Sequence, residues 1–467
     1  MVFSSISFLG IFLPIFLIAY FLIPKRGYRN AMIIVFSLFF YAWGEPIWIL
    51  GMIGLTFVDY ILALLEAKIK NEKARKLYLF GVVVINLLML FFFKYYNFFV
   101  GNINDFLGLN IPLHELRMPI GISFFTFQAL TYVVDVHRKN VEPQKNYFNL
   151  LLYISMFPQL IAGPIVRYAD VEKQITNRKE TIDGFNYGML RFAIGLAKKV
   201  IFANYAGLIA KSFLGANHIS KVSTAGAWFG MIMFLCQLYY DFSGYSDMAI
   251  GLGKILGFTY KENFNYPYIA KNVNDLWKRW HISLGEFFRD YVYIPLGGNR
   301  KHQYFNISVV WLLTGLWHGA NWNYVLWGVF FVIILISEKL LKKINVDIGN
   351  IPVLGNLGLL LIVFVGWSLF YFEDLSILKQ FFLACVGLTN NIAMGIREST
   401  PIYQYFFLIC VMLPGCTPLP KLIATKIFPE GTTRRVFMGS IFSCALLFVC
   451  FCLLLRQSYN PFMYFRF

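Results

Sequence analysis

The feature that most constrains the fold is a series of long apolar runs separated by short polar loops. Runs of about 17–25 residues, the length that crosses a bilayer as a helix, recur along the chain. Hydrophobic residues make up 58% of the 467 residues and charged residues only 14%, whereas a soluble domain carries about 25% charged residues. Because backbone polar groups cannot stay unpaired in lipid, such unbroken runs must span as helices. The sequence therefore predicts an all-α polytopic membrane protein.

The apolar runs also predict how the chain is organised. Strong candidate spans cover residues 5–24, 31–50, 52–66, 78–100, 185–210, 224–253, 321–337, 355–372 and 436–455. Weaker candidates lie near residues 119–135, 303–317, 376–390 and 402–414. No internal repeat or second soluble domain is visible, so residues 1–467 are expected to form one membrane domain. We expect about 11–13 transmembrane or re-entrant helices in it.

The segment of residues 147–168 does not fit simple spanning. Basic residues flank it on both sides, and Pro158 and Gly163-Pro164 interrupt its apolar run. Since basic flanks favour the cytoplasmic side, the pattern predicts a re-entrant element whose irregular backbone is buried in protein. An ordinary span kinked at proline is the alternative.

The charge distribution argues against several classes of function. The formal net charge is +17, but lysine and arginine gather in short loops. They are therefore expected to face anionic lipid head groups, and no nucleic-acid partner is predicted. The seven cysteines show no metal-ligand spacing, so neither a metal site nor a disulfide framework is predicted. No phosphate-binding loop or nucleophile elbow is present, which argues against an ATP-driven pump or a typical hydrolase.

The polar segment of residues 272–291 has helical periodicity. Its apolar residues at helical spacing are Leu276, Trp280, Leu284, Phe287 and Tyr291. A helix with tryptophans and a basic face suits the membrane interface, so we predict one amphipathic interfacial helix here.

His318 is the first candidate for chemistry, because it lies in the apolar run Trp311–Trp322. An ionisable side chain at membrane depth is costly and is usually retained for a function. A neutral imidazole takes up a proton near neutral pH, so His318 is a candidate general base in a water-poor passage. The segment Gly319-Ala-Asn that follows it is expected to give a ligand room near the backbone. The alternative is a structural histidine that donates a hydrogen bond to a neighbouring helix.

Other polar residues in and near the apolar runs are candidates for supporting roles beside His318. His281 lies on the predicted amphipathic helix, where it is an interfacial or capping residue, a second acid or base, or a group that orients the substrate. Asp241 and Asp247 lie in an apolar run, with Tyr240 and Ser243 beside them. Buried carboxylates should be paired, so these two line a polar path, orient a histidine, pair with basic residues such as Arg279 or Lys278, or serve as structural hydrogen-bond acceptors.

Several motifs together resemble the membrane-bound O-acyltransferase superfamily, in particular its bacterial alginate and peptidoglycan O-acetyltransferase branch. The motifs are Met118–Gln128 (MPIGISFFTFQ), Phe157–Tyr168 (FPQLIAGPIVRY), Tyr240–Ala249 (YDFSGYSDMA), Arg279–Leu284 (RWHISL), Gly315–Trp322 (GLWHGANW) and the tail Asn460–Phe467 (NPFMYFRF). They follow the expected order over nearly the whole chain, and the two histidine motifs are specific.

The resemblance implies a ring of transmembrane helices around a central funnel, with a catalytic core at about residues 118–335. His318 is then the catalytic residue and His281 supports it. The residues expected to line the tunnel or orient the substrate are Asp241, Ser243, Tyr240, Asp247, Asn321, Gln159 and Trp317. Arg279 and Lys278 are the hypothesised contacts for the phosphates of the acyl donor.

The resemblance also implies substrates, partners and location. The donor is cytoplasmic acetyl-CoA, and no cofactor is permanently bound. The acyl group passes through a bacterial plasma membrane to an extracytoplasmic partner of the SGNH-hydrolase type, which acetylates a cell-surface polysaccharide.

Two rival functions stay open. One is D-alanyl transfer to teichoic acid, with an acyl carrier protein as donor. The other is a non-enzymatic polysaccharide flippase or transporter, which would be expected to show two related halves.

Overall fold

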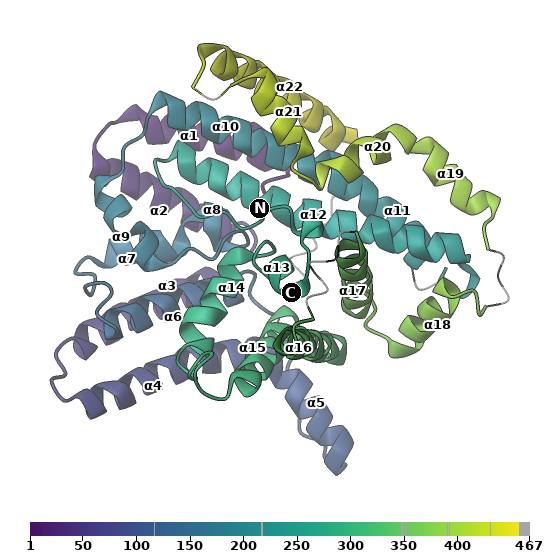
Figure 1. The fold of residues 1–467 in the computed structure, drawn as a ribbon. Coiled ribbons are helices and arrows are strands. Elements are labelled where there is room, and N and C mark those ends of the chain that lie inside the picture. The colour runs from purple at the N-terminus through teal and green to yellow at the C-terminus, as the bar shows by residue number, and fades with distance from the viewer. Residues whose placement is uncertain are drawn as a thin grey trace. The chain divides into compact units, whose positions relative to one another are not determined.

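The computed structural model describes residues 1–115, 117–215, 218–346, 349, 351, 353–389, 391, 393–429 and 431–456. All of their regular secondary structure is helical (Figure 1), which confirms the predicted all-α class. The motif Asn460–Phe467 lies outside the described residues. The chain forms two compact units, residues 1–192 with 248–261 and residues 193–247 with 262–467. This division leaves the prediction of one membrane domain as a prediction.

The first unit is built from the N-terminal helices. In chain order these are η1 (Phe8–Phe12), α1 (Leu13–Leu22), α2 (Arg26–Ala42), α3 (Trp48–Glu66), α4 (Glu72–Leu90), η2 (Phe91–Tyr95), α5 (Tyr96–Leu107), α6 (Ile122–His137), α7 (Tyr147–Ser155), α8 (Phe157–Leu160), α9 (Tyr168–Asn177) and the first part of α10 (Ile182–Ala197). The last residues of α12 (Thr224–Ile255) also belong to this unit.

The second unit contains the rest of α10 and α12 and the C-terminal helices. These are η3 (Lys198–Ala203), α11 (Asn204–Leu214), η4 (Ile219–Lys221), η5 (Pro267–Ile269), α13 (Val273–Trp277), α14 (Ile282–Phe288), η6 (Arg289–Tyr293), α15 (Gln303–His318), α16 (Trp322–Lys343), α17 (Leu354–Tyr371), α18 (Leu375–Cys385), α19 (Ile396–Gln404), α20 (Phe406–Gly415), α21 (Leu419–Ile427) and α22 (Thr433–Arg456).

Membrane-spanning potential is concentrated in a subset of these helices. Among the described residues, five helical stretches are long and apolar enough to cross a bilayer, and six if the bent pair α20 and α21 forms one span. Helix α12 is not one of them, although its 32 residues would extend about 48 Å at 1.5 Å per residue. Its middle carries buried polar side chains, including Gln237, Asp241 and Asp247, which lower its mean hydropathy.

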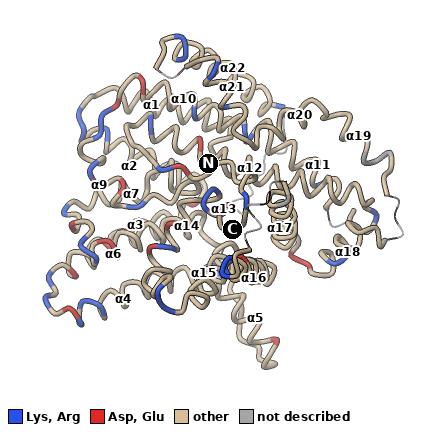
Figure 2. The backbone as a smooth tube through the Cα atoms, viewed as in Figure 1, with Lys and Arg blue, Asp and Glu red and all other residues tan. Residues whose placement is uncertain are grey.

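Charged residues in the first unit gather where its helices end. Figure 2 shows lysines, arginines and acidic residues together at the connection between α3 and α4. Arg75 there donates to the buried Glu66 at 3.1 Å, and His137 Nδ1 lies 2.6 Å from the same carboxylate oxygen. These charges lie at the end of α3 and in the first turn of α4.

The segment predicted as re-entrant consists of two short helices and extended chain. Helix α7 has nine residues and α8 only four, so neither crosses a bilayer alone at about 1.5 Å per residue. The backbone N–H of Phe157 donates to Ser37 Oγ at 3.1 Å, and Tyr153 OH donates to the Val166 carbonyl at 2.9 Å. Side chains thus pair irregular backbone that is buried inside protein, which favours re-entry over a kinked span.

The predicted amphipathic helix is interrupted. Helix α13 ends at Trp277, α14 begins at Ile282, and His281 between them has a φ of 46° in the left-handed region. The backbone N–H of Ile282 donates to Asn263 O at 2.9 Å, and the N–H of Asn265 donates to Arg279 O at 2.9 Å. The prediction of one continuous helix was wrong because pairing with residues 263–265 draws the chain out of the helix.

A carboxylate between α9 and α10 joins elements of the first unit. Glu180 accepts hydrogen bonds from Arg26 at 2.6 Å, Arg29 at 2.7 Å and Tyr20 at 2.5 Å. Burial alone would raise the pKa of Glu180, but the hydrogen bonds from Arg26 and Tyr20 and the Arg26 charge lower it from 4.5 to about 2. The ionised carboxylate therefore stabilises the fold.

Replacing Glu180 tests whether its ionised carboxylate stabilises the fold. Since the folded pKa lies below the ordinary value of 4.5, the stabilisation is complete above about pH 4.5 and disappears as the pH falls through about 2. We expect Glu180→Gln to lower the melting temperature at pH 7, and the difference from wild type to shrink between these two pH values. Melting curves in detergent across this range measure it. A difference that does not change with pH would contradict the assignment.

Glycines set the close approach of α15 to α16 in the second unit. A Cβ atom at Gly315 would meet the carbonyl oxygen of Tyr324, and one at Gly328 would lie 2.7 Å from the carbonyl oxygen of Trp311. Backbones can approach this closely only where side chains are absent, as at glycine-rich helix crossings in membranes. The two helices form an antiparallel hairpin that carries His318 at its turn.

Gly315→Ala tests the crossing. The added methyl group has to displace the backbone of α16, so we expect a loss of about 1–3 kcal/mol in unfolding free energy, as for overpacking elsewhere. Thermal unfolding of the purified protein in detergent measures it. Gly358→Ala is the matched control, because nothing lies within 4 Å of the position of its Cβ. Equal melting temperatures for the two variants would refute the role of Gly315.

Candidate active site

His318 is the last residue of α15 and is only 6% exposed. Its ring packs against the rings of Trp317, Trp327 and Phe370, with centroid distances of 5.0, 5.1 and 5.1 Å. Trp327 comes from α16 and Phe370 from the last turn of α17. Three helices of the second unit therefore surround the imidazole with aromatic rings.

His281 lies in the same unit, in the turn between α13 and α14, and is 3% exposed. Its ring contacts Trp317 at a centroid distance of 5.7 Å and Phe242 of α12 at 4.6 Å. Both predicted histidines thus contact the Trp317 ring, and their other aromatic neighbours differ. The structure brings together residues that are distant in sequence, as the prediction of a histidine pair requires.

A residue that sequence reasoning missed holds His281. The side-chain oxygen of the fully buried Asn263 lies 3.2 Å from His281 Nδ1. The same oxygen accepts from the backbone N–H of Ser283 at 3.2 Å and from its hydroxyl at 2.8 Å, and Asn263 Nδ2 donates to Ser246 Oγ at 3.0 Å. A single asparagine in a polar loop carries no spacing signal, so it could not be found from the sequence.

The surroundings of His281 favour its neutral form. The turn lies outside the candidate membrane spans. Burial lowers the pKa of His281 well below its ordinary value of 6.5, and the nearby His318 lowers it further. A neutral imidazole has one nitrogen that donates a hydrogen bond and one that accepts.

Asp241 and Asp247 are paired with lysines of η3. Lys199 Nζ lies 2.6 Å from Asp241 Oδ1, and Lys198 Nζ lies 2.7 Å from Asp247 Oδ2. Sequence reasoning suggested Arg279 or Lys278 as partners, whereas Arg279 pairs with Asp275 at 3.0 Å. The missed signal was the pair Lys198-Lys199 inside an apolar run, since a charge at membrane depth needs a counter-charge.

The ion pairs flank a close contact between the helices of the second unit. A Cβ atom at Gly244 would lie 2.7 Å from the carbonyl oxygen of Gly195. Segment η3 is π-helical, a local irregularity that is often found at functional sites. Asp241 and Asp247 thus fix the position of α12 against η3, and α12 in turn carries Phe242 and Ser246 towards the His281 turn.

The remaining predicted tunnel residues have varied surroundings. Tyr240 OH donates to the carbonyl oxygen of Met412 in α20 at 2.5 Å, so it ties α12 to α20. Ser243 is buried. Asn321 precedes α16, and its backbone carbonyl accepts from the N–H of Tyr324 at 3.2 Å. Gln159 belongs to the first unit, where it donates to the Tyr153 carbonyl at 2.5 Å.

The two residues predicted to contact the donor phosphates, Lys278 and Arg279, differ in how accessible their cationic groups are. Lys278 is exposed at the end of α13. Arg279 is engaged by Asp275 and by the carbonyl oxygen of Asn265, at 3.0 and 3.3 Å. Of the two, Lys278 has the more accessible cationic group.

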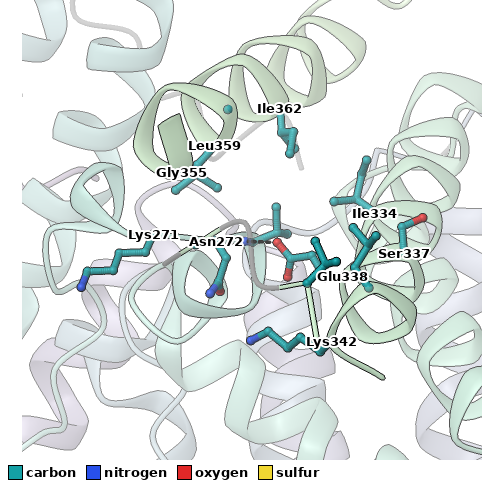
Figure 3. A pocket seen from close by; sticks show the side chains of 14 residues that line it. Lys271, Asn272, Ile334, Ser337, Glu338, Lys342, Gly355, Leu359 and Ile362 are labelled. Atoms are coloured by element: carbon teal, nitrogen blue, oxygen red, sulfur yellow. Dashed lines mark hydrogen bonds between the residues drawn. The ribbon is translucent and has the colours of Figure 1, made fainter. Parts of the chain in front are cut away.

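The expected space beside Gly319 is filled. A Cβ atom there would collide with the ring of Tyr324, so this glycine accommodates an aromatic side chain, and the prediction of room for a ligand was wrong. A pocket of about 280 Å³ lies elsewhere in the second unit, among α13, α16 and α17. In Figure 3 the Glu338 carboxylate points to the α13 backbone, where it accepts from Val273 N at 2.6 Å. The lining of this pocket includes neither histidine, so a passage beside His318 stays a prediction.

The fold and the site define a multi-pass helical membrane protein with a buried pair of histidines. Residues 47–376 match the model of the membrane-bound O-acyltransferase family. The chain belongs to this family and is an acyltransferase, which argues against a non-enzymatic flippase.

Three curated relatives show where in the family the chain lies. The chain is 37% identical to a Pseudomonas putida protein named probable alginate O-acetylase AlgI, over the full length of both. It is 33% identical to the peptidoglycan O-acetyltransferase of Helicobacter pylori over 72% of this chain and 70% of that protein. Its identity to the teichoic acid D-alanyltransferase of Bacillus subtilis is 28%, over 59% of this chain and 71% of that one.

Removing one partner of the buried Lys199–Asp241 pair tests its role. Asp241→Asn leaves the Lys199 charge without its counter-charge, so we expect a loss of about 3–5 kcal/mol in unfolding free energy. The double variant Lys199→Met/Asp241→Leu removes both charges and should recover most of that loss. Thermal unfolding in lipid nanodiscs measures the set.

The exposed pair Lys76–Glu72, with side chains 67% and 83% exposed, supplies the control. Glu72→Gln should change stability by less than about 0.5 kcal/mol. If the double variant were no more stable than Asp241→Asn, the damage would not come from an uncompensated charge.

Proposed function

We propose that this protein transfers acetyl groups from cytoplasmic acetyl-CoA across a bacterial plasma membrane for O-acetylation of a cell-surface polysaccharide. Similarity over the whole chain to an alginate O-acetylase and over most of it to a peptidoglycan O-acetyltransferase supports this acceptor class. The proposal includes an extracytoplasmic partner of the SGNH-hydrolase type, which attaches the acetyl group to the polysaccharide.

The observation that carries the proposal is the pair of buried histidines that share Trp317. In the proposed reaction a hydroxyl group of the acyl acceptor attacks the carbonyl carbon of the donor thioester. A C–O bond forms and the C–S bond breaks. His318 takes the hydroxyl proton and returns it to the leaving thiolate, so no further reactant is needed. Aromatic rings around His318 keep water from competing for the acyl group.

The residues around the histidines have supporting roles in this proposal. Asp241 and Asp247 act through their ion pairs, which hold α12 in place. Lys278, with an exposed ammonium group, meets the phosphates of the donor at the cytoplasmic face, and Arg279 supports that loop. No resident cofactor is required.

D-alanyl transfer from a carrier protein is the second candidate. The relative of that function covers less of this chain at lower identity, which favours the acetyl-transferring reaction. Membranes that contain the protein should therefore release CoA from labelled acetyl-CoA and leave a D-alanyl carrier protein unconsumed. Consumption of the carrier protein alone would reverse the choice.

His318→Ala tests the catalytic assignment. Loss of a general base costs typically 10²–10⁴-fold in rate, so we expect acetyl transfer from labelled acetyl-CoA to fall by at least about 100-fold. His218→Ala is the control, since His218 is an exposed histidine of the same unit. Inserted, folded His318→Ala protein that transfers acetyl at the wild-type rate would refute the role of His318.

A further inference from the structure

The side-chain amide of Asn263 is oriented by its surroundings. The backbone N–H of Ser283 lies 3.2 Å from one amide atom. Because a backbone N–H can only donate, that atom has to be the amide oxygen. The amide nitrogen then lies 3.0 Å from Ser246 Oγ, where it donates. Both ends of the Asn263 amide are thereby defined without reference to the histidine.

The orientation of Asn263 determines where His281 carries its proton. His281 Nδ1 lies 3.2 Å from the same amide oxygen, within the normal range for an N–H to oxygen hydrogen bond. An amide oxygen can only accept, so Nδ1 has to be the donor. In a neutral imidazole the second nitrogen, Nε2, then carries the lone pair.

We propose that Asn263 is a positioning residue that fixes His281 in the Nδ1-protonated tautomer, so that Nε2 of His281 serves in acyl transfer as a hydrogen-bond acceptor while His318 takes the proton. An Nε2–H group would instead donate a hydrogen bond to an oxyanion, which is a different catalytic role. The catalytic part of this inference rests on the proposed function. The tautomer itself does not.

The local backbone supports the positioning role. His281 is held in the left-handed region, with a φ of 46°, which is unfavourable for a residue with a Cβ atom. The Asn263 carbonyl accepts from Ile282 N at 2.9 Å, next to the strained residue. Strained residues persist where the surrounding structure determines their conformation, and they cluster at active sites. Asn263 thus constrains His281 through its backbone as well as through its side chain.

Burial of the His281 ring favours its neutral form, and a neutral imidazole has a defined tautomer. His281 is 3% exposed and its pKa is lowered by burial and by His318 of α15, so the ring is neutral at physiological pH. The carboxylates on the adjacent α12, Asp241 and Asp247, are paired with Lys199 and Lys198.

Solid-state ¹⁵N NMR of histidine-labelled protein in lipid tests the tautomer directly. The signal absent from the spectrum of His281→Gln identifies the ring, and we expect a protonated Nδ1 and an unprotonated Nε2 in the wild type at pH 7. This measurement requires no change at Asn263, so it stands even if variants there fold poorly. A wild-type ring protonated at Nε2 would overturn the proposal.

Variants at Asn263 test the positioning. Asn263→Leu keeps the shape but removes the acceptor, so we expect a loss of the single Nδ1-protonated state and a fall in kcat on the order of 100-fold. Asn263→Asp keeps an acceptor oxygen and should retain the proton on Nδ1 and recover part of the rate. Ser246→Ala is the matched control, because it removes the partner of the amide nitrogen and leaves the acceptor oxygen; its tautomer should match the wild type. An unchanged His281 signal in folded Asn263→Leu would overturn the proposal.

The two hypotheses fail separately. If the wild-type protein shows the Nδ1-protonated ring but does not release CoA from acetyl-CoA, the proposed function fails and the structural assignment stands. If acetyl transfer is intact and His281 is protonated at Nε2, the positioning role fails and the proposed function stands.

Discussion

Charge inside a lipid-embedded helix bundle has to be neutralised by the protein itself, and the second unit depends on this constraint. The Lys199 and Asp241 side chains are only 2% and 3% exposed and lie 2.6 Å apart. Removing either charge alone would leave the other buried without compensation. The second pair, Lys198 and Asp247, lies less than two turns further along α12. Together the pairs fix both the rotation and the axial position of α12 against η3.

That constraint reaches the candidate site because α12 has two functional faces. Asp241 and Gly244 face η3 and Gly195, whereas Phe242 contacts the His281 ring and Ser246 binds Asn263. A rotation of α12 that relieved the ion pairs would also displace Ser246 from Asn263. The geometry of His281 is therefore coupled to ion pairs that never touch its ring.

The sequence predicts the parts of this structure that depend on local physics. Apolar runs predict spanning helices such as α16, because lipid leaves a chain no other way to pair its backbone. His318, His281 and Trp317 could be found because their residue types are unusual in such surroundings. The break at His281 could not, since it depends on backbone pairing with residues 263–265. A helical periodicity of side chains records nothing about a distant backbone partner, and so it predicted one continuous helix.

The setting of His318 depends on chain beyond the predicted catalytic core of residues 118–335. The last carbonyls of a helix have no partner within it. In α17 the carbonyls of Leu369 and Phe370 accept from Asn323 Nδ2, at 3.4 and 3.2 Å. Asn323 therefore fixes the end of α17 against the start of α16, and this contact places the Phe370 ring beside His318. Three helices thus provide the aromatic surroundings of the imidazole. Glycines allow α15 to cross α16 closely, and the Asn323 side chain joins the start of α16 to the end of α17.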